Sequence, residues 1–90
     1  MYKTTLSVEG MMCGMCEQHV REAVQNALAE NHVEAKKITA SRKDKELVVL
    51  AEHSIDEKLL RSAVEATGYE TGLYRSEVYE EKGFFKRLFG

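Results

Sequence analysis

Two cysteines are all that this chain of 90 residues contains, and it contains no proline. A small domain held together by disulfides needs more than one cysteine pair, so a disulfide scaffold is excluded. A formal net charge of -2 argues against a nucleic-acid partner, because phosphate binding requires a clustered excess of lysine and arginine. No apolar run is long enough to span a bilayer.

The first ten residues, MYKTTLSVEG, have neither the basic region nor the apolar region of a secretory signal. We therefore expect a cytoplasmic protein, whose thiols are kept reduced. The apolar fraction of 43% and the charged fraction of 31% are those of an ordinary soluble domain. Closely spaced, reduced cysteines in such a domain indicate metal binding or catalysis.

Hydrophobic periodicity predicts four strands and two helices. Alternating apolar and polar residues are typical of a half-buried strand, and apolar residues spaced by three and four are typical of a helix. The strand candidates are residues 2–9, 35–41, 46–52 and 69–74, the last extending towards Tyr79. One helix is expected from Cys16 to about Glu30, and a second helix is expected to follow the capping-box sequence of Ser54 and Glu57 and to stop at Gly68.

The order of these elements predicts an α+β fold. Strand, helix, strand, strand, helix, strand is the order of the ferredoxin-like βαββαβ sandwich, a four-stranded antiparallel sheet with two helices on one face. The domain is expected to span residues 1–76, and residues 77–90 are expected to be a C-terminal extension.

Both cysteines lie in the connection from the first strand to the first helix, and three chemistries are open to Cys13 and Cys16. A thiol at a helix start has a lowered pKa, which suits redox catalysis. Thioredoxin-like enzymes, however, have a cis-proline facing the cysteine pair, and this chain has no proline. A closed zinc site needs four ligands, and the three histidines lack the spacing of such a site. Two soft thiolates are sufficient for Cu(I), which low coordination satisfies.

The segment from Gly10 to Cys16, GMMCGMC, resembles the Gly-Met-x-Cys-x-x-Cys loop of the heavy-metal-associated domain. That family comprises copper chaperones, metal-binding modules of P-type ATPases and mercury-binding proteins. The resemblance covers about residues 2–76, because the order of elements and the pair Gly68-Tyr69 also match. It implies a copper-chaperone-like protein that is not an enzyme.

The resemblance also implies the metal ligands, which are Cys13 and Cys16, and a core position under the loop for Met11. Zinc-pumping relatives add a carboxylate beside the cysteines, whereas this chain has Met12 directly before the first of them. Glu17 is expected to act as a favourable charge in the first helical turn. Three more residues lie at or near the loop with a part in the site left open: Met15, His19 and Tyr69.

The function implied is cytosolic binding and transfer of a soft metal ion, with Cu(I) before Zn(II) or another soft divalent ion. The metal would pass by thiolate exchange to a partner such as a P-type ATPase or another metal-binding protein. Two alternatives stay open. One is a thiol-disulfide oxidoreductase that uses the same cysteines, and the other is a zinc-, cadmium- or mercury-binding module of the same fold.

All three phenylalanines of the chain lie in its last seven residues, FFKRLFG. Four apolar residues in this segment have the spacing of one face of a short amphipathic helix: Phe84, Phe85, Leu88 and Phe89. Such a face is expected to dock on protein, in this chain or in a second copy, or more weakly on a membrane surface.

Overall fold

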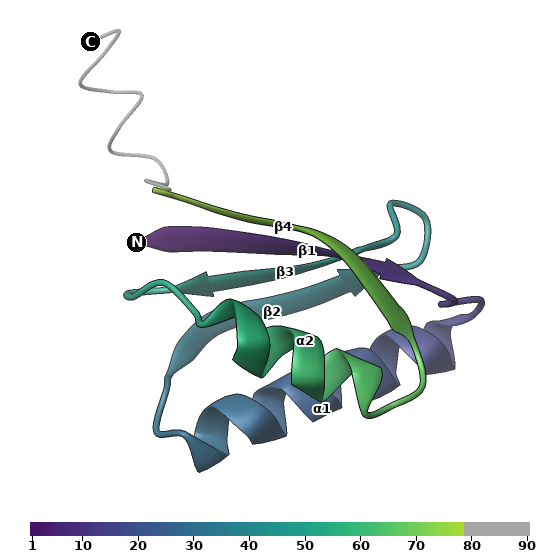
Figure 1. Cartoon of the computed structure of the whole chain (residues 1–90), viewed down its shortest axis with the longest axis horizontal. Coiled ribbons are helices and arrows are strands. Elements are labelled where there is room, and N and C mark those ends of the chain that lie inside the picture. Colours follow the sequence, from purple (N-terminus) through teal and green to yellow (C-terminus); the bar gives the residue numbers. More distant parts are fainter. Residues whose placement is uncertain (79–90) are drawn as a thin grey trace, which may run out of the picture.

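The computed structural model describes residues 1–78 of the chain. It contains four strands and two helices in the expected βαββαβ order (Figure 1). In chain order the elements are β1 (Tyr2–Glu9), α1 (Gly14–Glu30), β2 (Ala35–Ser41), β3 (Glu46–Ala51), α2 (Glu57–Glu65) and β4 (Glu70–Val78). The amphipathic face expected in the C-terminal extension lies outside the described residues. No helix within residues 1–78 is long and apolar enough to cross a membrane.

The four strands form one antiparallel sheet in the order β2-β3-β1-β4. Both helices cover the same face of this sheet, as Figure 1 shows. Tyr2 pairs with Ala51 on one side and with Val78 on the other, so β4 ends beside the start of β1. The ferredoxin-like fold expected from the order of elements is therefore confirmed.

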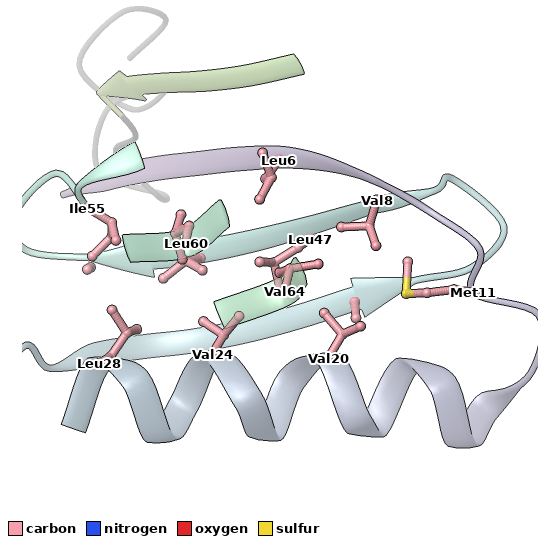
Figure 2. Packing of buried hydrophobic residues seen from close by; sticks show 13 residues of the cluster. Leu6, Val8, Met11, Val20, Val24, Leu28, Leu47, Ile55, Leu60 and Val64 are labelled. Carbon is pink, nitrogen blue, oxygen red and sulfur yellow. The ribbon is translucent and has the colours of Figure 1, made fainter. Parts of the chain in front are cut away.

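Apolar side chains from every element fill the layer between the sheet and the helices (Figure 2). The alternation in β1 buries Leu6 and Val8 completely, and Thr4 lies on the same side of the strand. The helical stripes expected from the sequence bury Val20, Val24 and Leu28 from α1, and Leu60 and Val64 from α2. Burial of this stripe holds each helix against the sheet.

The strand register shifts at one place in each of two strand pairs, β2 with β3 and β1 with β4. The register of β2 against β3 shifts between Ala35 and Lys37, which leaves Lys36 as an extra residue, and its ammonium lies 3.3 Å from the carboxylate of Glu52. The register of β1 against β4 shifts after Leu6. There Gly72 packs so closely that a Cβ would lie 3.2 Å from the Cβ of Ser7.

The expected capping box at the start of the second helix is wrong. Asp56, rather than Ser54, is the N-cap of α2, and its carboxylate accepts a hydrogen bond from the backbone N–H of Leu59 at 3.3 Å. The reason is Ile55, which is 3% exposed and belongs to the core. Because this side chain is buried from an extended segment, the helix begins only after it. At the other end Gly68, at φ +100°, makes the turn into β4.

Candidate metal centre

Three loops meet at the end of the molecule where β1 leads into α1 (Figure 1). The β1–α1 connection carries the cysteines. The β2–β3 loop is joined to β1 by a hydrogen bond from the backbone N–H of Val8 to the carbonyl oxygen of Lys45, 2.9 Å long. The α2–β4 turn brings the ring of Tyr69 against Gly10. Residues far apart in the sequence therefore surround the cysteine pair.

The cysteine loop is held by the two residues that open it. Gly10 has φ +103°, a left-handed conformation, and a Cβ at this position would lie 3.1 Å from a ring carbon of Tyr69. Met11 is 8% exposed, and its side chain reaches into the core beside Val8 and Val20 (Figure 2). The loop is thereby fixed to the sheet from below, in the core position expected for Met11, while the residues after it stay at the surface.

The two thiols lie side by side at the start of α1. Cys13 is exposed and extended, and its carbonyl oxygen accepts hydrogen bonds from the N–H groups of Cys16 at 3.0 Å and of Glu17 at 3.3 Å. Both cysteines are free, and their sulfur atoms are 3.4 Å apart. This separation is shorter than two metal–thiolate bonds of about 2.3 Å each, so a single ion can contact both sulfurs.

The surroundings of Cys16 stabilise its ionised form. The pKa of this thiol is lowered from 9.0 to about 6, chiefly by the Tyr69 hydroxyl, then by the backbone of Met12 and by the side chain of Cys13. The pKa of Tyr69 is raised in turn by its interaction with Cys16. A thiolate is both the metal ligand and the nucleophile in cysteine chemistry. At neutral pH Cys16 is therefore ready for either role.

The other residues expected near the loop do not complete a larger ligand set. Met12 and Met15 are 86% and 66% exposed, and His19 is exposed on α1. Within the part of the chain that the structure describes, no group of three or more histidine, cysteine, aspartate or glutamate side chains is placed to hold an ion. The geometry thus offers two sulfurs on an open surface rather than four enclosed ligands.

One contact beside the loop was not expected from the sequence. Glu17 does lie in the first turn of α1, but its carboxylate also accepts a hydrogen bond from the backbone N–H of Arg42 at 2.7 Å. The Arg42 guanidinium lies 4.0 Å from the same carboxylate. These residues are 25 positions apart, and no local pattern in the sequence indicates that they meet.

No sequence family matches the chain, and no curated protein sequence matches it. Solved structures do match. A copper-binding domain from HMA7, a P-type ATPase, has a TM-score of 0.70 at 22% identity over 87% of this chain and 100% of that domain. The copper chaperone Atx1 from Synechocystis PCC6803 has a TM-score of 0.60 at 26% identity over 76% of this chain and 97% of its own. The copper chaperone of Enterococcus hirae has a TM-score of 0.59 at 26% identity, over 76% and 94%.

These matches confirm the resemblance that the loop motif carries, because the chain has the fold of heavy-metal-associated domains. Within that class its structure is copper-chaperone-like, since chaperones as well as an ATPase domain superpose on it over most of their length.

Proposed function

We propose that this protein binds Cu(I) through Cys13 and Cys16 and transfers the ion to a partner protein in the cytoplasm. The observation that carries the proposal is the pair of free sulfurs, 3.4 Å apart on an exposed loop, with the pKa of one thiol lowered to about 6. The copper chaperones and the ATPase copper-binding domain that share the fold support the same function.

The donor set favours Cu(I) over Zn(II). Thiolates are soft ligands, and they select soft ions such as Cu(I). Zinc in a closed site takes four ligands, whereas the described residues bring only two sulfurs together at this loop. A zinc, cadmium or mercury module of the same fold would need further ligands from solvent or from a partner.

An ion held by two exposed sulfurs can be passed on by ligand exchange. The incoming thiol releases a proton, its thiolate forms a bond to Cu(I), and one bond between Cu(I) and a cysteine sulfur breaks. The released thiolate then takes up a proton, and the charge of the copper ion is unchanged. Cys13 is the more accessible of the two sulfurs, so we expect exchange to begin there. No organic substrate is converted, and the protein acts as a carrier and not as an enzyme.

A P-type ATPase or another metal-binding protein is the partner class that suits this surface. Met12 and Met15 flank the first cysteine and expose most of their side chains. Exposed methionines adapt to different partner surfaces and supply an apolar contact around the sulfurs. A partner that covers them would shield the ion from water during exchange.

A competitive titration with Cu(I) and Zn(II) tests the proposal. Wild type should bind one Cu(I) per chain far more tightly than Zn(II), and the variant Cys13→Ser/Cys16→Ser should lose this binding. Comparable affinities for the two ions would contradict the choice of Cu(I). Equal Cu(I) binding by the variant would contradict the choice of ligands.

The lowered pKa of Cys16 and its closeness to the second sulfur also suit a thiol-disulfide oxidoreductase. Reduction of insulin disulfides distinguishes this second candidate. Robust turnover with a thiol reductant would favour the oxidoreductase, and activity no greater than that of the reductant alone would favour the carrier.

A further inference from the structure

The β2–β3 loop is fastened to both segments that flank the cysteine loop. One end is held by the hydrogen bond from the Val8 N–H to the Lys45 carbonyl oxygen, 2.9 Å long, just before the cysteine loop begins. The other end is held by the hydrogen bond from the Arg42 N–H to the Glu17 carboxylate, 2.7 Å long, just after it. Within the loop the Asp44 N–H donates to the Ser41 hydroxyl at 3.1 Å. The backbone of Arg42 is therefore held in one position relative to the thiols.

This position places a guanidinium beside the chain between the two cysteines. The Nη1 atom of Arg42 would lie 3.4 Å from a Cβ at Gly14, the residue that directly follows Cys13. A Cβ there would be in ordinary van der Waals contact with the guanidinium, so the charged group lies directly beside the segment that joins the two cysteines. The Arg42 side chain is 50% exposed, and its contact with Glu17 is long, at 4.0 Å. The exposed half of this side chain is therefore accessible to a ligand from solvent.

The acidic neighbour, Glu17, contacts the guanidinium only at the long distance of 4.0 Å. One oxygen of Glu17 accepts the short hydrogen bond from the Arg42 backbone, and the side chain of Glu17 is only 25% exposed. A guanidinium with free donors matches a carboxylate in geometry, because its planar fork can bind both oxygens. The surface beside the sulfurs thus combines a soft metal site with a fixed point for a carboxylate.

We propose that Arg42 is a recognition point for the carboxylate of a small anionic thiol, of the glutathione class, that exchanges Cu(I) with Cys13 and Cys16. The inference rests on the proposed function, since it concerns the same two sulfurs. In the delivery step, a cysteine thiolate forms a bond to Cu(I) carried by the small thiol. The bond from Cu(I) to the small thiol breaks, the released thiolate takes up a proton, and the copper ion stays monovalent.

The metal-free protein provides a test that does not depend on copper. Its thiols are reacted with two disulfide reagents, the neutral dithiodipyridine and dithiobis(nitrobenzoate), which carries two carboxylates. In each reaction a cysteine thiolate attacks the reagent disulfide and releases one aromatic thiolate. The second cysteine then attacks the mixed disulfide and releases another, so the protein dithiol is oxidised and the reagent is reduced. Stopped-flow absorbance gives both rates.

Arg42→Gln should slow the reaction with the anionic reagent about two- to five-fold, the range of an exposed ion pair, and leave the neutral reagent unaffected. Arg42→Lys should retain only part of the wild-type rate, because it keeps the charge but loses the planar fork that binds both carboxylate oxygens. High salt should remove the difference between wild type and Arg42→Gln, because exposed charges are screened. Lys58→Gln is the matched control, since it removes one exposed positive charge from α2 near Asn31, at the far end of α1.

Equal slowing of both reagents by Arg42→Gln would show that Arg42 only supports the loop and would overturn the inference. An unchanged rate with the anionic reagent, or a Lys58→Gln variant as slow as Arg42→Gln, would overturn it as well. Failure of the proposed function is seen separately, as the absence of tight Cu(I) binding by wild type in the metal titration.

Discussion

The Tyr69 hydroxyl is the largest cause of the lowered pKa of Cys16, so Tyr69→Phe removes the main stabilisation of this thiolate. The substitution keeps the aromatic ring that lies against Gly10 and deletes a single oxygen atom. We therefore expect the loop to retain its conformation while the pKa of Cys16 rises. A hydrogen-bonding group that favours the charged form of a thiol has this effect on its pKa.

The size of the rise follows from the causes that act on Cys16. Four of them lower the pKa and burial opposes them, with a net change from 9.0 to about 6. The Tyr69 hydroxyl is the largest of the four, so its removal takes away at least a quarter of the lowering and moves the pKa of Cys16 back towards 9.0. At pH 6 the thiolate fraction of Cys16, about half in wild type, should then fall several-fold.

Ultraviolet absorbance of the thiolate, followed against pH in the reduced, metal-free protein, measures this change. The midpoint of the first thiolate to form should lie near pH 6 in wild type and move upwards in Tyr69→Phe. Tyr74→Phe is the control, because it removes the hydroxyl that donates to the Ile55 carbonyl oxygen at 2.5 Å, away from the thiols. An unchanged midpoint in Tyr69→Phe, or an equal rise in Tyr74→Phe, would refute the role of Tyr69.

Three further expectations are checked by urea denaturation. Thr4→Val should raise the free energy of unfolding by about 1 kcal/mol, because the buried hydroxyl has no hydrogen-bond partner among the described residues; a decrease would contradict this. Met11→Ala should lower it by about 2–4 kcal/mol, whereas Met12→Ala at an exposed position should change it by less than about 0.5 kcal/mol; equal effects would exclude a core role for Met11. His32→Gly should raise it by about 1 kcal/mol, because His32 has φ 58° after α1, and a loss of stability would count against strain there.

Most of the fold could be predicted from local patterns. The alternation in residues 2–9 and the helical spacing from Cys16 correspond to β1 and α1, because each element buries one face against the same core. The start of α2 could not be predicted in this way. Ser54 and Asp56 both suit a helix cap, and the choice between them depends on the burial of Ile55, which is a tertiary contact.

The part of the candidate site that lies in one short sequence motif could be predicted, whereas the contacts made by a distant loop could not. Cys13 and Cys16 lie three positions apart in one short motif, and that motif indicated both that the two thiols lie together and that Met11 is buried. The contact between Glu17 and Arg42 arises only when the β2–β3 loop packs beside α1. A local pattern contains no information on such a contact, which is why the position of Arg42 beside the cysteine loop was not predicted.

The measurement that tests the central claim most directly is copper-edge X-ray absorption of the Cu(I)-loaded protein whose methionines are replaced by selenomethionine. We expect the signal of sulfur neighbours only, contributed by Cys13 and Cys16, and its loss in Cys13→Ser/Cys16→Ser. A selenium neighbour would assign Met12 or Met15 to the metal, and an imidazole signal that disappears in His19→Ala would assign His19. Either result would contradict a site made of two thiolates alone.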